Sequence, residues 1–375
     1  MAHYLDNAAT TQVLKCAADK AYFMMTGEFA NPSAVHTAGR RAAAELASAR
    51  AALAEALGCE KNEITFTSGA TEATNTELLG AARKYGRKSR HIITGAAEHA
   101  ATLNTAARLE NEGFEVTYLK PGPSGSVSVQ DVEHALREDT VLISLMMVNN
   151  ETGAITPIGE ITRMLRRHKH VAFFHTDVVQ AFFKLPFSLH ALGVDFASVS
   201  GHKFGAPKGV GALYIRDGLR IPPLLTGGGQ EGGMRSGTEA LPLIAAMGEA
   251  CRCRAENFER NEKSVQALYD YLLERLRCLP VRLNGGGVPG IVNLSIPGTK
   301  SEVMIRILES AEVYVSGGSA CSRGKRSHVL TAMNIPAADI DGALRISFSP
   351  ENTADDVDAF VEGIKAGMTR FGVKF

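Results

Sequence analysis

The sequence has no excess of charge of either sign. Forty lysine and arginine residues balance forty aspartate and glutamate residues in a chain of 375. Proteins that bind nucleic acid or an anionic membrane through their overall charge are basic. The balance gives no reason to expect either partner, so we predict no nucleic-acid binding and no membrane binding.

Long apolar runs are also missing. The apolar run at residues 141–148 is far shorter than the ~18 residues that a membrane-spanning helix needs. The six cysteines fall at irregular spacings, and we see no signal peptide, so we predict no disulfide framework. We therefore expect a soluble protein in a reducing cytoplasm.

A metal site is not expected either. Cys251 and Cys253 lie two positions apart on a predicted helix, where their side chains point in different directions. Structural zinc sites use four ligands, and the sequence offers no third or fourth ligand near this pair. We predict that these cysteines hold no metal.

The length suits a large domain followed by a smaller one. Predicted strands alternate with helices in the first part, and they lie at residues 63–67, 91–94, 114–119, 141–148, 171–174, 196–199 and 211–215. Such alternation indicates a doubly wound α/β sheet that is mostly parallel, with helices on both faces. Beyond about residue 255 the elements become short and mixed, which predicts a smaller α+β domain.

One lysine stands where chemistry is favoured. The segment SVSGHKFGAPKG, residues 198–209, begins as an apolar strand and then brings hydroxyls, a histidine and Lys203, before glycines and a proline that forbid a helix. Partial burial beside other cations lowers the lysine pKa from about 10.4 and makes the amine nucleophilic toward aldehydes. The natural aldehyde is pyridoxal phosphate (PLP). The alternative is an ordinary solvated surface lysine.

A second segment is suited to phosphate. Residues 63–67 form a predicted strand, and SGATEA at residues 68–73 leads directly into a helix. The N–H groups and the positive end of a helix dipole attract anions, and Thr71 adds a hydroxyl. The alternative is an ordinary capped turn, in which these residue types are also common.

Polar residues follow five separate predicted strands. They are Ser68, Gly69 and Thr71; His99; Asn150; Asp177 and Gln180; and Ser200, His202 and Lys203. Sites in doubly wound sheets lie at the carboxyl ends of the strands. We therefore predict that these residues share one site.

Three further features lie outside these strands. The segment GGGQEGGMRSGT, residues 227–238, is either a flexible linker or a loop that approaches a ligand or another subunit. Cys321 lies in small, polar sequence with basic residues close behind, which favours an exposed thiolate, although a lone cysteine is more often inert. Arg345, which we expect at the end of a strand, is a candidate fork for a carboxylate.

In order along the chain, seven motifs resemble those of the cysteine desulfurases, PLP-dependent enzymes of fold type I in the class V aminotransferase group. The motifs are YLDNAATT (4–11), TSGATE (67–72), VNNETG (148–153), HTDVVQ (175–180), SGHK (200–203), RSGT (235–238) and SAC (319–321). The last motif indicates the NifS/IscS-like subgroup. The resemblance implies residues 1–12 packing with the small domain, a PLP-binding domain of residues 13–255 and a small domain of residues 256–375 that carries the Cys321 loop.

The resemblance also implies roles around PLP. Lys203 would bind the cofactor aldehyde and move protons, and His99 would stack on the ring. Asp177 would pair with the ring nitrogen, although a helix-capping aspartate is the alternative. Asn150 and Gln180 would contact the ring oxygen. The phosphate would be held by Ala70, Thr71, Ser200 and His202. Thr238 would reach the site of a neighbouring subunit in a homodimer.

For the reaction, the resemblance implies that Arg345, helped by Asn150, holds the carboxylate of L-cysteine. Cys321 would take the sulfur as a persulfide, with release of L-alanine, and pass it to an iron–sulfur scaffold or a tRNA-thiolation enzyme. The segment from Cys321 to His328 is shorter than the usual loop of the family, so it reaches less far.

Other functions use the same scaffold. A selenocysteine lyase or another carbon–sulfur lyase would not need Cys321, and an aminotransferase has no use for a reactive thiol. A cofactor-free interaction scaffold would have no need of Lys203, Asp177 and His99.

Overall fold

The computed structural model describes residues 2–317 and 326–374. Its centre is a seven-stranded sheet in the order β2-β8-β7-β6-β5-β3-β4, and only β8 runs antiparallel to its neighbours. The strands are β2 (Ile64–Thr67), β3 (His91–Gly95), β4 (Glu115–Leu119), β5 (Thr140–Ser144), β6 (Phe173–Asp177), β7 (Phe196–Ser200) and β8 (Gly211–Ile215). The predicted mostly parallel sheet is confirmed.

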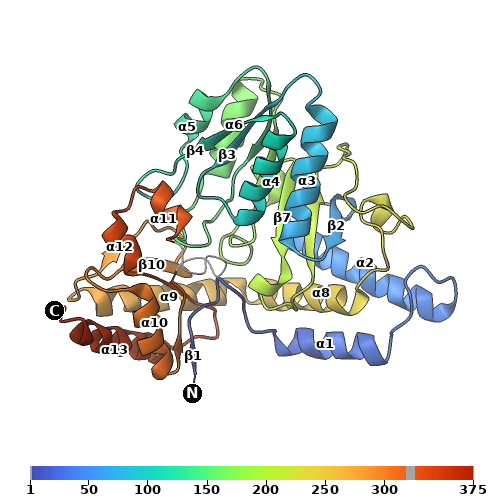
Figure 1. Ribbon diagram of the computed structural model, residues 1–375. Helices are drawn as coiled ribbons and strands as arrows, with labels where there is room; N and C mark the ends of the chain where they lie inside the picture. Colours follow the sequence, from blue (N-terminus) through green and yellow to red (C-terminus); the bar gives the residue numbers. More distant parts are fainter. Residues whose placement is uncertain (1, 318–325, 375) are drawn as a thin grey trace.

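Helices cover this sheet (Figure 1). They are α1 (Lys15–Thr26), α2 (Thr37–Leu57), α3 (Ala70–Tyr85), α4 (Ala100–Asn111), α5 (Val129–Ala135), α6 (Ile158–Arg167), α7 (Leu189–Leu192) and α8 (Leu241–Glu256). Helix α8 packs along both α1 and α2. Helices α3 and α4 lie side by side in front of the strands in Figure 1, whereas α1 and α8 run below them.

Local sequence explains where the helices begin and end. Helix α2 is rich in alanine, and the His36 side chain caps its start by accepting from the Gly39 N–H. Gly58 ends it with φ of 63°, a left-handed conformation that glycine adopts without steric cost. The predicted C-cap at Gly58 is confirmed.

Two strands differ from the prediction. The run at 141–148 ends as a strand at Ser144, although residues 145–148 stay buried, because an apolar run reports burial rather than strand pairing. The strand expected at 171–174 is β6, which continues to Asp177. The hydropathy pattern does not predict the polar end of β6, because His175 is polar but buried. Its Nδ1 lies 2.8 Å from the Ser144 hydroxyl oxygen and its Nε2 lies 3.2 Å from the Ser198 hydroxyl oxygen.

The C-terminal part has its own core. A three-stranded antiparallel sheet, β12-β10-β9, packs with helices α9, α10 and α13 around a second group of buried apolar residues. The elements of this part are α9 (Phe258–Leu276), β9 (Arg282–Leu283), β10 (Ile291–Ser295), α10 (Ser301–Ser310), β11 (Val313–Tyr314), α11 (His328–Ala332), α12 (Ala337–Asp341), β12 (Ala343–Ser347) and α13 (Ala354–Arg370). The start of the chain joins it, because β1 (His3–Tyr4) pairs with β11 and Leu5 is fully buried in this core.

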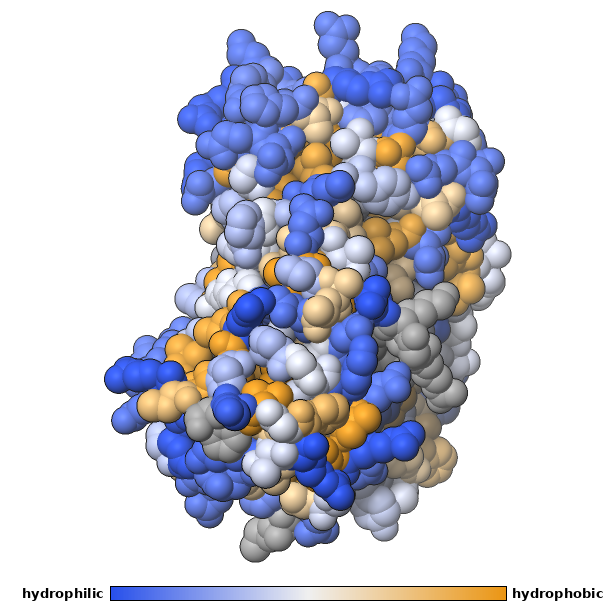
Figure 2. Space-filling model, turned by 60° about the vertical axis from the view of Figure 1, so that its left-hand side comes forward, coloured by the Kyte–Doolittle hydropathy of each residue, from blue (hydrophilic) through white to orange (hydrophobic). Residues whose placement is uncertain are grey.

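The surface is mixed in character. On the face shown in Figure 2, hydrophilic side chains cover most of the area, apolar patches show between them, and the outline is indented between an upper and a lower part. Within residues 2–317 and 326–374, no helix has both the length and the apolar character to cross a membrane.

The contact between α2 and α8 gives a stability prediction. A Cβ added to Gly248 would lie 2.6 Å from the Ala49 Cα, which is backbone and cannot move aside. In an open helix, Gly→Ala stabilises by about 0.5–1 kcal/mol. We expect Gly248→Ala to lower the free energy of unfolding by about 1–3 kcal/mol instead, because overpacking outweighs helix propensity.

The matched control is Gly159→Ala in α6, where the nearest atoms to an added Cβ lie 3.5 Å away, an ordinary contact. This change should be neutral or stabilising. Urea unfolding followed by circular dichroism measures both. A stabilised Gly248→Ala protein would show that the two helices pack less tightly than the structure indicates.

Candidate active site

A cavity of about 710 Å³ opens at the carboxyl edge of the large sheet. The residues that follow β2, β3, β5, β6 and β7 line it together. Those expected from the sequence are Ser68, Gly69, Ala70, Thr71, His99, Asn150, Asp177, Gln180, Ser200, His202, Lys203 and Arg345. Strand ends far apart in the sequence therefore meet at one place, as sites in such sheets do.

Lys203 ends the short 3-10 helix η2 (Gly201–Lys203), which continues directly from β7. Its Nζ donates to the carbonyl oxygens of Ala8 and Ala9 at 2.7 and 2.8 Å. The N–H and hydroxyl of Thr11 both donate to the His202 carbonyl, at 2.9 and 3.0 Å. The N-terminal motif thus forms one wall of the cavity, a role that its turn-prone sequence did not reveal.

The start of α3 forms a cup that suits phosphate. Gly69 is the N-cap of this helix, and Ala70 and Thr71 line the cavity at its first turn. Gly211 of β8 lies directly behind, because a Cβ there would be 2.6 Å from the Gly69 Cα. Ser200 borders the cup, and the helix N-terminus supplies N–H donors and positive potential.

Asp177 is the last residue of β6 and is buried, with Oδ1 accepting from the Val179 N–H at 2.8 Å. Burial raises the pKa of Asp177, and His99, the Val179 N–H and Lys203 partly oppose the rise. His99 caps α4 through Nδ1, which accepts from the Ala101 N–H at 3.1 Å. The neutral imidazole therefore carries its proton on Nε2.

Two more buried carboxyl groups, which no sequence pattern indicated, lie near Asp177. Glu77 and Glu98 have pKa values well above the usual range, mainly because of burial, and the charge of Asp177 adds to both rises. The Glu98 oxygens accept from the Met146 N–H at 2.9 and 3.0 Å. A cation placed beside Asp177 would relieve this accumulation of buried acid.

His202 stays neutral at physiological pH. Burial, followed by the charges of Lys203, Lys208 and Lys184, lowers its pKa to about 4. Its Nδ1 lies 3.1 Å from the Thr10 hydroxyl oxygen. An uncharged ring at this position can offer a hydrogen bond to an anion without adding another cation.

Lys184 is a second residue that the sequence did not reveal. Its Nζ donates to Gln180 Oε1 at 3.1 Å, while Gln180 Nε2 donates to the Ala8 carbonyl at 2.9 Å. Lys184 thereby fixes the orientation of the Gln180 amide. Burial, and then the charges of Lys203 and Arg254, lower the pKa of Lys184 to about 7. It lines a second cavity of about 480 Å³, and Lys203 lies between the two cavities because it lines both.

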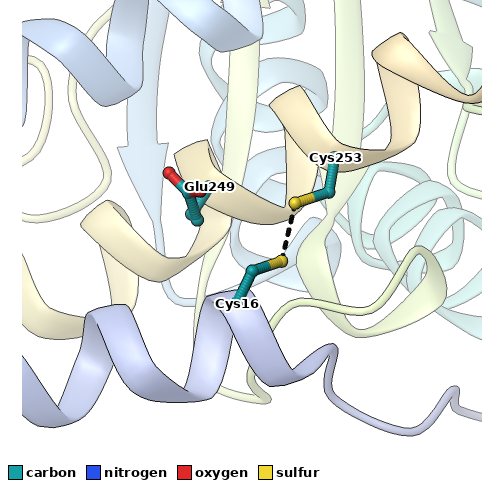
Figure 3. Close-up of side chains that lie close together, drawn as sticks. All are labelled: Cys16, Glu249 and Cys253. Carbon is teal, nitrogen blue, oxygen red and sulfur yellow. Dashed lines mark hydrogen bonds between the residues drawn. The ribbon is translucent and has the colours of Figure 1, made fainter.

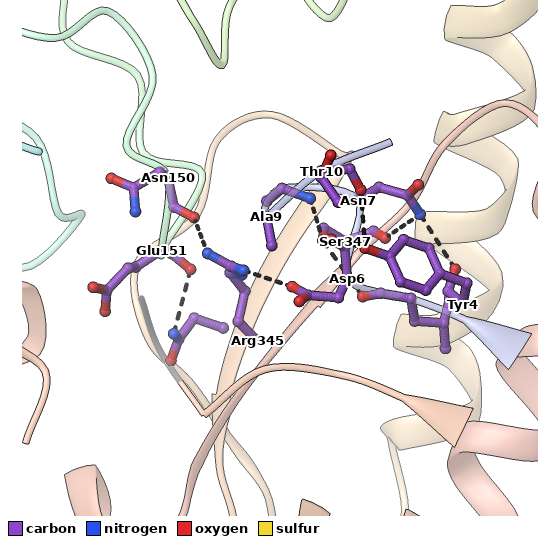
Figure 4. Close-up of polar contacts among 12 residues, drawn as sticks. Tyr4, Asp6, Asn7, Ala9, Thr10, Asn150, Glu151, Arg345 and Ser347 are labelled. Atoms are coloured by element: carbon purple, nitrogen blue, oxygen red, sulfur yellow. Dashed lines mark hydrogen bonds and ion pairs between the residues drawn. The ribbon is translucent and has the colours of Figure 1, made fainter. Parts of the chain in front are cut away.

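Arg345 lies deep in the structure, with 1% of its surface exposed. It stands at the centre of β12, so the expected position at a strand end is wrong. Its guanidinium donates to the Asn150 carbonyl at 3.0 Å and to Asp6 at 2.6 Å (Figure 4). Among the described residues, Arg345 Nε and Asn150 Oδ1 are buried and have no hydrogen-bond partner. Such atoms call for a ligand.

Cys321 lies outside the described residues. The chain that resumes after it is fixed at the cavity, which Arg326 and His328 both line. His328 Nε2 lies 2.9 Å from the Glu98 carbonyl oxygen, and the Ser327 hydroxyl donates to Glu151. Cys321 therefore lies five residues before Arg326, which lines the cavity.

Thr238 does not line the cavity of this chain and is exposed. Its glycine-rich segment is not a free linker, because Glu231 binds Arg50 at 2.6 Å and accepts from the Phe66 N–H at 2.8 Å. Arg235 pairs with Glu72 at 3.0 Å. The segment is thus held against α2, β2 and α3.

Known proteins resemble the chain over nearly its whole length. A profile of the family described as Aminotransferase class-V matches residues 3–360. A cysteine desulfurase IscS of Methanosarcina thermophila is 42% identical over 365 residues, which cover 96% of this chain and 90% of that protein. The chain belongs to the class V aminotransferases, in the cysteine desulfurase group. This confirms the family predicted from the motifs.

Other members of the cysteine desulfurase group agree. A putative cysteine desulfurase IscS 1 of Bacillus subtilis (strain 168) is 41% identical, covering 94% of this chain and 95% of that protein. A solved NifS-like protein superposes with a TM-score of 0.94 at 35% identity, covering 99% and 100% of the two chains. The structure of SspA in complex with cysteine gives 0.83 at 36% identity, covering 94% and 100%. The fold is that of the fold type I PLP enzymes, as predicted.

The cavity fits the cofactor of this family. The α3 cup suits phosphate, the Lys203 amine can bind an aldehyde, and Asp177 offers a buried carboxylate to a protonated ring nitrogen. Asn150, whose buried Oδ1 has no hydrogen-bond partner among the described residues, lines the same cavity. Four separate requirements of PLP are thus met in one space.

The low pKa of Lys184 gives a prediction about stability and pH. Lys184 titrates at about 7 in the folded protein against 10.5 for an ordinary lysine, so between these values only the unfolded chain binds the proton. Stability therefore rises with pH across this window. In the apoprotein, we expect Lys184→Met to reduce the increase of the free energy of unfolding with pH. The substitution should stabilise the protein most below pH 7, where the wild-type Lys184 amine is charged in the folded protein.

Urea unfolding midpoints at a series of pH values from 7 to 10.5 measure the effect. Lys15→Met, on the exposed side of α1, is the matched control and should leave the slope unchanged. Equal slopes for the wild-type and Lys184→Met proteins would mean that Lys184 is solvated rather than buried.

Proposed function

We propose that the protein is a PLP-dependent cysteine desulfurase that removes sulfur from L-cysteine and releases L-alanine. The observation that carries the proposal is the single cavity that holds the Lys203 amine, the buried Asp177 carboxyl, the α3 cup and the Arg345 fork. The name of the relative from Methanosarcina thermophila and the cysteine bound to SspA support the choice of substrate.

The cofactor would be held by residues on separate strand ends. Thr71, Ser200 and His202, with the backbone at Ala70, would bind its phosphate, and Asn150 and Gln180 its ring oxygen. Asp177 would keep the ring nitrogen protonated, and His99 would cover the ring. When bound, PLP supplies a sink for the electrons released at the substrate Cα.

Lys203 has the position of a proton carrier. Its Nζ is held by the Ala8 and Ala9 carbonyls at the cavity wall, and once free of the cofactor it can move a proton to or from the substrate Cα. Its charge helps to lower the pKa of the neighbouring Lys184, so the two amines lie close enough to interact.

Arg345 would bind the substrate carboxylate. Its guanidinium already holds the Asn150 carbonyl and Asp6, and the buried Nε remains for an anion. A guanidinium held by two partners loses little freedom on binding and presents a planar fork to a carboxylate. It thus sets which end of cysteine faces the cofactor.

Cys321 would accept the sulfur. Its thiolate forms the new sulfur–sulfur bond as the carbon–sulfur bond of the substrate breaks, and the substrate carbon takes a proton, so cysteine and the thiol yield alanine and a persulfide. Arg326 lines the cavity and lies five residues away in sequence. Five extended residues span at most about 18 Å, so the thiol has the length of chain to enter.

We also infer a homodimer in the cytoplasm, with Thr238 completing the neighbouring site and residues 256–375 acting as a small domain. Thr238 is exposed on a loop held at the molecular surface. Large apolar side chains are exposed on and after α1, as expected of a subunit interface; they are Tyr22, Phe23, Met25, Phe29 and Val35. The acceptor of the sulfur would be an iron–sulfur scaffold or a thiolation enzyme.

Trapping the persulfide tests the proposal. The holoenzyme is incubated with L-cysteine, alkylated and digested, and the Cys321 peptide is examined by mass spectrometry while alanine is measured. We expect the persulfide on Cys321, and a loss of alanine formation of at least about 100-fold in Cys321→Ala. Cys278→Ala, at an exposed position outside the cavity, is the control.

Sulfide release that is unchanged in Cys321→Ala would instead support a selenocysteine lyase or another carbon–sulfur lyase. If the protein shows no borohydride-sensitive yellow absorbance with PLP, all the PLP-dependent functions are contradicted. The cofactor-free interaction scaffold would then be the remaining alternative.

Arg345 gives a separate prediction. Arg345→Lys keeps the positive charge but loses the planar guanidinium, and with it one hydrogen bond to the substrate carboxylate. A hydrogen bond to a charged group contributes about 1.5–3 kcal/mol, so kcat/KM for cysteine should fall about 10- to 100-fold. The change should appear mainly in KM, with the PLP absorbance retained. Arg306→Lys on the exposed side of α10 is the control. An unchanged KM would exclude Arg345 as the carboxylate site.

A further inference from the structure

Two cysteines from distant parts of the chain meet outside the cavity. Cys16 lies on α1 and Cys253 on α8, and their sulfur atoms are 2.7 Å apart (Figure 3). Both side chains are partly exposed, so a small oxidant can reach them. Cys251, two positions from Cys253, is buried on another side of α8 and donates to the Ala52 carbonyl.

The structure corrects the expectation that no further ligand group lies near Cys253. No partner for Cys253 was visible in the sequence because Cys16 precedes it by 237 residues, and the two meet only where α1 packs on α8. The Glu249 carboxylate is also near, which makes a three-group cluster. The cluster could therefore either bind a metal or form a disulfide.

The distances favour the disulfide. Two sulfurs 2.7 Å apart, each about 2.3 Å from a zinc ion, would subtend only about 72° at the metal, far below the tetrahedral angle of about 109°. Glu249 is already paired with Arg252 at 2.8 Å. A disulfide needs the sulfurs to approach to about 2.05 Å, which is a small movement.

The pair lies next to the segment that carries Lys203. Just before Cys16, the Leu14 N–H donates to the Gly205 carbonyl at 2.8 Å. Just after Cys253, Arg254 Nε donates to the Phe204 carbonyl at 3.1 Å. A bond between the two cysteines would therefore join the two elements that hold residues 204 and 205 by their backbone.

We propose that Cys16 and Cys253 form a reversible intramolecular disulfide that fastens α1 to α8 beside the Lys203 segment. The oxidant is a peroxide. With hydrogen peroxide, one cysteine loses its proton and attacks as the thiolate, which gives a sulfenic acid and hydroxide, and the released proton converts the hydroxide to water. The second thiol then attacks the sulfenic sulfur and releases a second water as the disulfide forms. The two sulfurs lose two electrons and two protons in total, and a dithiol reductant reverses the change.

The surroundings of Cys253 favour its thiol form. Burial, the contact with Cys16 and the charges of Glu249 and Glu256 raise the pKa of Cys253 to about 12. Cys253 thus stays a thiol at neutral pH. In a reducing compartment the pair is held as the dithiol until an oxidant appears.

The first test maps the bond. Full-length holoprotein in a Cys321→Ala background, which removes the other expected reactive thiol, is treated with hydrogen peroxide and digested without reduction. We expect a linked pair of peptides containing Cys16 and Cys253, lighter by two hydrogens and separated by dithiothreitol. Cys16→Ser and Cys253→Ser should each abolish the link, and Cys251→Ser, the neighbouring cysteine on the same helix, should keep it.

The second test asks whether the bond fastens the helix. Hydrogen exchange of residues 11–20 should slow on oxidation in Cys251→Ser and stay unchanged in Cys16→Ser. No link under conditions that oxidise the exposed Cys278 would overturn the proposal. A link with unaltered exchange would overturn the fastening, and tight zinc binding that is lost in both single variants would replace the disulfide with a metal site. None of these outcomes depends on the desulfurase activity.

Discussion

The hydrogen bonds from the Lys203 amine to the Ala8 and Ala9 carbonyls are the constraint on which the site depends. The segment that supplies these carbonyls begins in the small sheet, where β1 pairs with β11, and passes Asp6, which holds Arg345. It then reaches the large sheet through Thr11. One short stretch of backbone therefore sets the distance between the Lys203 amine and the Arg345 guanidinium, although the two come from different cores.

Charge is arranged around this segment in two groups. On one side, Asp177, Glu77 and Glu98 are buried close together, and burial raises the pKa of each carboxyl. On the other, Lys184 and Arg254 lie near Lys203, and the pKa of Lys184 falls. Within each group, like charges and burial favour the neutral forms. The charge of Lys203 acts on both groups, because it lowers the pKa of Asp177 and that of Lys184.

The sequence predicted most of what depends on local pattern. The strands at 63–67, 196–199 and 211–215 and the cap at Gly58 follow from alternation and glycine chemistry, and the polar residues after the strands meet because parallel strands share an edge. What it missed depends on contacts between distant residues. Lys184 is notable because burial and the charges of Lys203 and Arg254 lower its pKa, and Cys253 because α1 brings Cys16 to it. The polar end of β6 was not predicted for the same reason, because the partners of its His175 side chain lie on other strands.

The position of the cysteine pair relative to Lys203 suggests how the two features are related. Neither sulfur lines the cavity, so a bond between them adds nothing to the groups that react. It acts on the elements that hold the carbonyls of Phe204 and Gly205, the residues directly after the lysine. In the proposed reaction Lys203 releases one partner and engages another, which needs some freedom in its backbone. The proposed disulfide would limit that freedom by fastening α1 to α8, without touching the side chain. Control of this kind would change how readily Lys203 moves and leave its chemistry intact.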